Sequence, residues 1–283
     1  MKTKKFILKG MLVAAITGLM VTGCKKETED QDTTAASDDA AAEQTYNDVS
    51  NIADQAYKGS VNYKQAQEGS MLSTCAQVKL DTASGSNPDT ITVTFGTGTY
   101  PTLSNCLCSD GRYRRGRIIV TFSGKYRDSA SVHTITFDNY YVNDNQITGT
   151  KTVKNNGHNS SGNLNWTVTV NGSIILASGG GTITWNSTRT REWLSGANTP
   201  FNWLDDVYGI AGSQTGINAK GVSYSAVITK QLKVALNCHW ITEGTLELTP
   251  AGKAKRTIDY GSGTCDNKAT VTINNNTYTV NMK

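Results

Sequence analysis

The chain has 283 residues and a formal net charge of +4, and 37% of its residues are hydrophobic. That length is enough for one large domain or two smaller ones. It has only three histidines and contains no HExxH pair, GxSxG elbow, P-loop or strand–GxGxxG–helix unit, which excludes the common signatures of zinc proteases, serine hydrolases and nucleotide-binding enzymes.

The N-terminus has the pattern of a bacterial export signal. Four lysines lie within the first nine residues, no acidic residue precedes Glu27, and an apolar run covers residues 11–21. This run is too short to span a bilayer as a stable helix, so residues 1–23 are predicted to be a signal peptide. The run ends in Val-Thr-Gly before Cys24, which resembles the lipobox of bacterial lipoproteins. We therefore expect cleavage before Cys24 and attachment of membrane-anchoring acyl chains to that cysteine.

The residues after this cysteine bear on location. In the lipoproteins that this start resembles, an aspartate directly after the cysteine often means retention at the inner membrane, whereas this chain has Lys25. The acidic residues that follow, Glu27 and Glu29 among them, are similar to the surface-export signals of some diderm bacteria. We expect the protein at the outer membrane, on its periplasmic or cell-surface face. The membrane is then its partner through the lipid on Cys24, and binding to nucleic acid is not expected.

Charge is divided unevenly along the chain that would remain after cleavage. Residues 25–54 hold two lysines and nine acidic residues, a balance of 2 − 9 = −7, and residues 55–283 carry +7. Residues 24–44 are polar, small and acidic, and this composition predicts a disordered tether. The basic remainder could hold anionic surfaces such as lipopolysaccharide or acidic glycans, or its charge could serve solubility alone.

One helix is predicted before the strands begin. Apolar residues recur at helical spacing over residues 45–57, and Gly59 follows as a stop signal. We expect this short helix, followed by a connector to residue 69, to lie with its apolar side on the domain that follows. The apolar positions are Tyr46, Val49, Ile52, Ala53 and Ala56.

Residues 70–283 alternate between apolar and polar side chains, as in 91–95, 166–170 and 224–228, and clusters of asparagine and glycine separate these runs. This pattern predicts an all-β domain, an antiparallel meander of about a dozen strands that closes as a barrel or a sandwich. Four glycines lie 25, 23 and 24 residues apart, which fits one hairpin per repeat: Gly124, Gly149, Gly172 and Gly196.

Five cysteines remain besides Cys24, and an exported protein can form disulfides. Cys238 and Cys265 both lie among the last strands and are expected to pair. Cys75 is expected to pair with Cys106 or Cys108, which leaves one thiol over. Two alternatives stay open: five buried free thiols, or a metal held by the Cys-x-Cys pair, although no histidine or second pair supports a metal there.

Two groups of acidic residues are weak candidates for chemistry. Asp205 and Asp206 are adjacent, and paired carboxylates carry out glycoside hydrolysis, but a loop turn before a strand is the preferred explanation of this pair. Asp259, Asp266 and Asn267 lie among glycines and could bind calcium through oxygen atoms, although a tight turn beside Cys265 explains the same residues. No other cofactor is expected.

Two further groups are candidates for binding. Four arginines cluster in the sequence DGRYRRGR and could clamp carboxylate or phosphate groups, or could form a solvated strand edge: Arg112, Arg114, Arg115 and Arg117. Three aromatic residues lie in a loop-like stretch and could stack on sugar rings or enter a partner, or could plug one end of the core: Trp193, Phe201 and Trp203.

Three runs, RRGRIIVTFSGKYRD, ITFDNYYVNDNQITGTKTV and DYGSGTCDNKATVTINNNTYTV, resemble a recurrent family of uncharacterised lipoproteins of diderm bacteria. The resemblance covers most of residues 70–283 and implies a shared β-fold and a surface or periplasmic address. The family has no assigned activity, so the resemblance transfers no functional residue. We expect a non-catalytic binding or structural module for a glycan, lipid or protein. The alternatives are a carbohydrate-active enzyme using Asp205 or Asp206 and a lipocalin-like carrier of a hydrophobic ligand.

Overall fold

The computed structural model describes residues 30–61, 72, 76–82, 89–123, 128–199, 202 and 204–282. These residues form one long helix, a 3-10 turn and fourteen strands. The helix is α1 (Thr34–Val61), and the 3-10 turn is η1 (Ala177–Gly179). The strands are β1 (Ala76–Asp81), β2 (Asp89–Phe95), β3 (Cys106–Leu107), β4 (Tyr113–Ser123), β5 (Val132–Val142), β6 (Asn145–His158), β7 (Leu164–Ile175), β8 (Thr182–Ser195), β9 (Val207–Ile217), β10 (Ser223–Ala235), β11 (Ile241–Pro250), β12 (Arg256–Ser262), β13 (Lys268–Ile273) and β14 (Asn276–Asn281).

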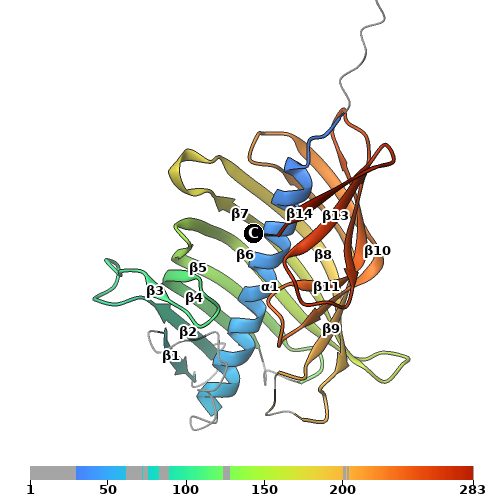
Figure 1. The fold of residues 1–283 in the computed structure, drawn as a ribbon. Helices are drawn as coiled ribbons and strands as arrows, with labels where there is room; N and C mark the ends of the chain where they lie inside the picture. The colour runs from blue at the N-terminus through green and yellow to red at the C-terminus, as the bar shows by residue number, and fades with distance from the viewer. Residues whose placement is uncertain are drawn as a thin grey trace, which may run out of the picture.

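The strands form one antiparallel sheet in chain order, with β3 alone off the path and paired to β4. The prediction of an all-β antiparallel meander is therefore confirmed. Within the described strands, β1 and β14 are the two ends and do not pair with each other, so the barrel alternative is wrong, whereas the predicted sandwich or an open sheet fits. Figure 1 shows the sheet curling around α1, with β13 and β14 on the side of the helix opposite β4–β6.

The inner face of the sheet is buried against α1, and the outer face is exposed, because side chains alternate along each strand. In β8, Ile183 and Trp185 are buried while Asn186 and Thr188 are exposed. The helix contacts strands from both halves of the sheet, including β2, β4, β8 and β11. The core is thus a helix enclosed by one curved sheet.

The glycines expected to mark a repeat serve different purposes. At Gly149, where φ is +108°, an added Cβ would lie 2.2 Å from the carbonyl O of Asn171 in the next strand. At Gly172, an added Cβ would lie 1.9 Å from the hydroxyl of Tyr46, so this glycine makes room for the helix. Gly196 adjoins Asp206, and Gly124 lies outside the described residues. The even spacing is therefore no sign of a common structural unit.

The helix is longer than predicted. The predicted apolar stripe is buried as expected, with each of its five residues no more than 1% exposed. However, α1 begins at Thr34, so the assignment of residues 34–44 to a disordered tether is wrong, and Ala35, Ala36 and Ala42 join the core. Residues 24–29 of that tether lie outside the described residues. The composition suggested a segment unable to bury itself, but the sheet and its loops supply a partner for each of its acidic side chains: a cation for Glu43, neutral side-chain donors for Asp39 and a backbone N–H for Asp38.

No helix in the described part of the chain combines the length and the apolar character needed to cross a membrane.

Candidate functional site

The acidic side chains of residues 30–54 are bound to the sheet and its loops along the whole length of α1. Each of the seven makes a contact of this kind: Asp30 with Arg256, Asp32 with Lys253, Asp38 with the backbone N–H of Ala219, Asp39 with Trp185 and Gln214, Glu43 with Arg189, Asp48 with Arg112, and Asp54 with Arg191. We call this set of contacts the ionic interface. Five of these seven carboxylates are therefore paired with cations from the part of the sequence that carries net positive charge.

The middle of the ionic interface is closed to solvent. Arg189 Nη2 lies 2.6 Å from Glu43 Oε2, and both side chains are only 3% exposed. Asp39 accepts hydrogen bonds from Trp185 Nε1 at 2.9 Å and Gln214 Nε2 at 2.8 Å. Burial raises the pKa of Asp39 to about 6, against the opposing effect of the Gln214 hydrogen bond. The sheet thus holds this carboxyl with neutral donors.

A buried lysine lies beside the same stretch of helix. Lys151 Nζ donates a hydrogen bond of 2.5 Å to the carbonyl O of Tyr46. Burial lowers the pKa of Lys151 to about 7. The void between Lys151, Arg189 and the helix measures about 10 Å³, roughly the space of one water molecule. The inner face of the sheet therefore leaves no room here for a substrate.

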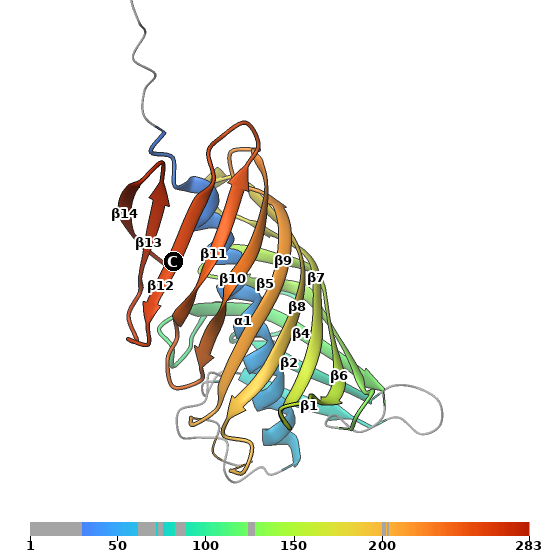
Figure 2. The same ribbon diagram turned by 90° about the vertical axis from the view of Figure 1, so that its right-hand side faces the viewer.

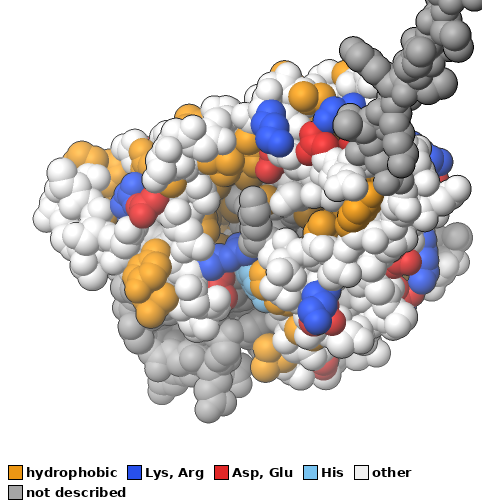
Figure 3. Space-filling view, turned by 45° about the horizontal axis from the view of Figure 1, so that its top comes forward, with side chains coloured by type: hydrophobic (Ala, Val, Ile, Leu, Met, Phe, Trp, Pro, Cys, Tyr) orange, Lys and Arg blue, Asp and Glu red, His pale blue; other side chains and the backbone are white. Residues whose placement is uncertain are grey.

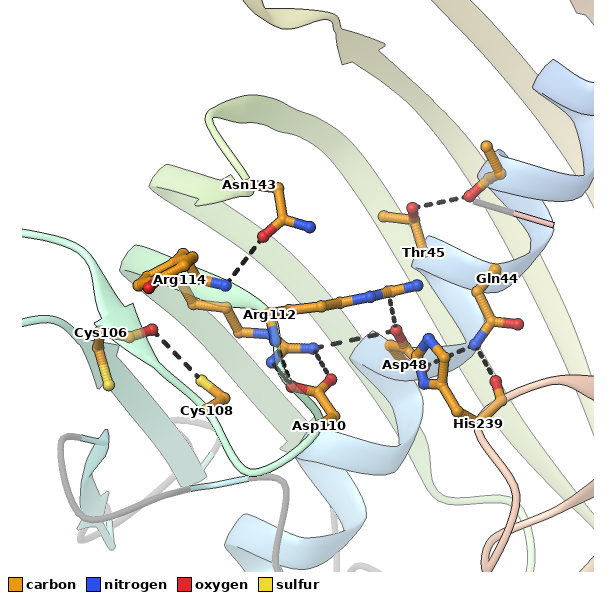
Figure 4. A network of polar contacts seen from close by, with 12 residues as sticks. Gln44, Thr45, Asp48, Cys106, Cys108, Asp110, Arg112, Arg114, Asn143 and His239 are labelled. Carbon is orange, nitrogen blue, oxygen red and sulfur yellow. Dashed lines mark hydrogen bonds and ion pairs between the residues drawn. The ribbon is translucent and has the colours of Figure 1, made fainter. Parts of the chain in front are cut away.

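One end of the ionic interface joins three parts of the chain that are distant in sequence (Figure 4). Asp48 comes from α1, Asp110, Arg112 and Arg114 from the β3–β4 hairpin, and His239 from the β10–β11 loop. Arg112 Nη1 lies 2.5 Å from Asp48 Oδ2, and Arg114 contacts both oxygens of Asp110, at 2.7 and 2.6 Å. We call these five residues the Asp48 cluster. It ties the two halves of the sheet together across the helix.

The Asp48 cluster has the residue types of a metal or acid–base site. The candidate ligand atoms of Asp48, Asp110 and His239 all lie within 4.8 Å of one another. However, both carboxylates are already paired with guanidinium groups, which balance their charge. Burial raises the pKa of Asp48 against the effect of Arg112, and burial lowers the pKa of His239. These arrangements favour a clamp between elements over a cation site or a catalytic pair.

Gln44 completes this clamp from the helix. Its Nε2 donates to Asp48 Oδ1 at 3.1 Å and to the backbone carbonyl of His239 at 2.5 Å.

Seen from the open side of the sheet, basic and acidic side chains lie together at a central hollow, with a histidine beside them (Figure 3).

The four arginines predicted to bind an anion do not converge. Arg112 and Arg114 face α1 in the Asp48 cluster, whereas Arg115 and Arg117 lie on the outer face. Arg115 pairs with Asp144 and stacks 3.9 Å from the ring centre of Tyr141. Arg117 lies 3.9 Å from Asp138 and 3.4 Å from the ring centre of Tyr100. Because each arginine has a carboxylate partner, they do not form one anion clamp.

The aromatic candidate Trp193 belongs to the core, so its prediction as an exposed stacking residue is wrong. It is 5% exposed, lies 5.8 Å from the ring of Tyr208 and 6.2 Å from that of Trp166, and donates from Nε1 to Asp206 at 3.2 Å. The plug interpretation explains it. Phe201 and Trp203 lie outside the described residues.

Asp205 and Asp206 do not form a pair for acid–base chemistry. Asp206 is 1% exposed and is bound by Trp193 and Tyr208 inside the aromatic cluster. Asp205 Oδ2 instead accepts a hydrogen bond of 2.7 Å from the hydroxyl of Thr199 in the preceding loop. The carbohydrate-active alternative therefore lacks the two carboxylates on which it was based.

The candidate calcium ligands act as turn residues. Asp259 Oδ1 accepts from the N–H of Gly261, and Asp266 Oδ1 from the N–H of Lys268, each at 2.8 Å. The backbone carbonyl of Asn267 accepts from the N–H of Met282 at 2.7 Å. These bonds support the tight-turn interpretation of the segment.

The predicted pairing of Cys238 with Cys265 is present, with 5.8 Å between the Cα atoms. It fastens the loop that carries His239 to the β12–β13 connection. Cys106 is also disulfide-bonded, and Cys108 is a buried free thiol. The alternative of five free thiols is therefore wrong. Cys75 lies outside the described residues.

A groove that no motif in the sequence indicated lies on the outer face of β7–β11. This face is nearest the viewer in Figure 2, with α1 behind it. A hollow of about 620 Å³ is lined mostly by threonine, serine and asparagine, and a second of about 450 Å³ continues it. The two hollows share Asn186, Thr215, Ser225 and Thr249. We call this combined feature the outer groove. Alternation predicted exposed polar residues here, but not the strand register that aligns them.

Comparisons with protein-family models, with curated proteins and with solved structures found no match to this chain.

Proposed function

We propose that the chain is a bacterial lipoprotein, anchored at the outer membrane through lipid on Cys24, and that it serves there as a non-catalytic binding module with the outer groove as its binding face. The basic start, the apolar run and the Val-Thr-Gly-Cys24 sequence support the anchor. Lys25 in place of an aspartate favours the outer membrane over the inner one.

The observation that carries a binding role is the division between the inner and outer faces of the sheet. The inner face is filled by α1, and the charged groups there have ionic or hydrogen-bond partners within the molecule. The outer groove is open and has a hollow large enough for a small ligand. A ligand therefore has space on the outside, where the lining offers hydrogen bonds rather than acid–base groups.

Neither alternative function gains support from the fold. A lipocalin-like carrier needs an apolar cavity inside a closed sheet, but α1 occupies the inner face and the described strands do not close. A carbohydrate-active enzyme needs two facing carboxylates, but Asp205 and Asp206 are held by different partners.

The anchor is tested by labelling cells with radioactive palmitate and separating their membranes. The wild-type chain is expected to carry label and to sediment with outer membranes, because its acyl chains are held by the bilayer. Cys24→Ala should carry no label. Equal labelling of the two proteins, or no labelling of either, would contradict the proposal.

Binding is tested on lipidated protein purified in detergent, by a thermal-shift screen. The panel contains neutral and acidic glycans, lipopolysaccharide fragments, fatty acids, calcium and EDTA. A ligand at a hundred times its dissociation constant adds about 2.7 kcal/mol to stability, so a bound class should raise the melting temperature by several degrees. A pull-down with the wild type and with a variant of the outer groove tests for a protein partner. The binding role fails if no ligand class raises the melting temperature and if the pull-down finds no protein that the wild type retains and the variant loses.

A further inference from the structure

We infer that the outer groove binds a neutral polysaccharide chain that lies across strands β7–β11. This inference rests on the proposed function and specifies the ligand class of the same site. It follows from three properties of the groove: its charge, the chemistry of its side chains and their alignment between strands.

The charge of the groove is balanced. Among the residues that line the larger hollow, Glu247 and Lys255 carry charge, and Lys255 Nζ lies 2.8 Å from Glu247 Oε1. An anionic or cationic polymer would therefore find no unpaired counter-charge in the lining. The outer groove thus differs from the net positive charge of residues 55–283 as a whole, because the lining of its larger hollow contains one acidic and one basic side chain.

The other lining side chains match a polyhydroxylated ligand. Hydroxyl and carboxamide groups both donate and accept hydrogen bonds, as sugar hydroxyls do. A protein partner would instead favour an apolar centre with aromatic or aliphatic anchors. The lining of the outer groove exposes two large apolar side chains, Val227 at 46% in the larger hollow and Ile217 at 42% in the smaller one, and neither is aromatic. The composition thus favours a glycan over a protein.

The polar side chains are aligned by the register of the sheet. One row consists of successive cross-strand partners from β7 to β11: Asn171, Asn186, Thr215, Ser225 and Thr249. Neighbouring strands lie about 4.8 Å apart, a step comparable to the length of one pyranose unit. A chain lying across the strands can therefore place successive sugars over successive side chains.

A second row extends beyond the groove toward the N-terminal strands. Its hydroxyl side chains are successive partners from β4 to β9: Thr121, Thr134, Thr152, Thr169, Thr188 and Ser213. Five strand spacings give a row of about 24 Å, which suits a polymer rather than a single sugar. β-Branched threonines have few rotamers to lose, so this surface is ordered before binding at low entropic cost.

The test is native gel electrophoresis of the lipidated protein in detergent, in gels containing neutral polysaccharides (dextran, mannan, xylan or galactomannan) or anionic ones (alginate or polygalacturonate). We expect at least one neutral polymer to retard the protein and the anionic ones to have no effect. The variant Thr188→Val/Thr215→Val removes two hydroxyls and keeps the β-branched shape. This variant should weaken binding at least tenfold. The control Thr270→Val makes the same change in β13, outside the outer groove, and should leave binding unchanged.

All three substituted threonines occupy exposed or half-buried positions, so equal melting temperatures of the wild type and the two variants confirm that the fold is intact. Retardation by no neutral polymer, or equal retardation of wild type and groove variant, overturns the inference. Retardation by the anionic polymers alone overturns it as well. The proposed function and the glycan inference can fail separately. If Cys24 is labelled by palmitate and the protein binds another ligand class through Thr188 and Thr215, the proposed function stands and the glycan is rejected.

Discussion

At Asp39, burial and hydrogen bonding compete over one carboxyl group. Its pKa is raised from 3.8 to about 6. Between pH 4 and pH 6, therefore, this carboxyl is protonated in the folded protein and ionised in the unfolded chain. This residue therefore contributes most stability below about pH 4, and that contribution is lost as the pH rises through 6. Gln214 Oε1 has no hydrogen-bond partner in the described residues, although Gln214 Nε2 serves both oxygens of Asp39.

Asp39→Asn is expected to stabilise the protein at pH 7. The amide cannot ionise, it can still accept from Trp185, and its NH₂ group can supply the donor that Gln214 Oε1 lacks. The pKa shift corresponds to roughly 2–3 kcal/mol at pH 7, with the gain fading toward pH 4. Urea unfolding at pH 4 and pH 7 measures this. Equal destabilisation at both pH values would show that the lost charge-assisted bonds matter more than burial.

At the scale of the element, α1 is held by buried ion pairs rather than by an apolar stripe alone. The Glu43–Arg189 pair is the most enclosed of them. Breaking a buried pair by removing one partner leaves the other charge without compensation, whereas replacing both removes the need for it. This distinction separates the cost of an orphaned charge from the value of the pair itself.

Arg189→Met alone should lower the free energy of unfolding by about 3–5 kcal/mol. Glu43→Met/Arg189→Met together should restore most of that loss, because no charge is then left buried. A double-mutant cycle by urea unfolding measures the coupling. Arg115→Met, on the outer face and partly exposed, is the control and should cost less than about 1 kcal/mol. If the double variant has a lower free energy of unfolding than either single variant, the ion pair stabilises the protein by more than the burial of its two charges costs.

The same element marks how far the sequence could be interpreted. The apolar spacing from Tyr46 to Ala56 predicted the buried part of the helix, and alternation predicted strands and their exposed faces. The first turns of α1 were missed because Asp39 and Glu43 resemble solvated residues until Gln214 and Arg189 are placed beside them. These partners lie 175 and 146 residues away in the chain, and a local pattern contains no information about such contacts. The outer groove was missed for the same reason, since it depends on register.

At the scale of the whole molecule, the two halves of the sheet meet through the Asp48 cluster and the Cys238–Cys265 disulfide. The disulfide fixes the loop that carries His239, and its cysteines are 27 residues apart. The same loop is also held by the hydrogen bond from Gln44 to the carbonyl of His239 and by the packing of Leu236 and Trp240 against the core.

Replacing both cysteines, Cys238→Ser/Cys265→Ser, is expected to lower the free energy of unfolding by about 3–4 kcal/mol, because a loop of this length gains conformational freedom in the unfolded chain. Hydrogen exchange should also become faster at the N–H groups around His239. Urea unfolding and exchange measured by mass spectrometry check the two effects. An unchanged free energy of unfolding would mean that the Asp48 cluster, rather than the disulfide, holds the two halves of the sheet together.

The enclosure of α1 has a consequence for the order of events during synthesis. The helix is made first, but Arg256, which binds Asp30, follows it by 226 residues, and Lys253 follows Asp32 by 221. Contacts between such distant positions form late and slow the search for the native state. The acidic segment therefore emerges long before its cations exist, and the sheet cannot complete its interior until β12 has been made.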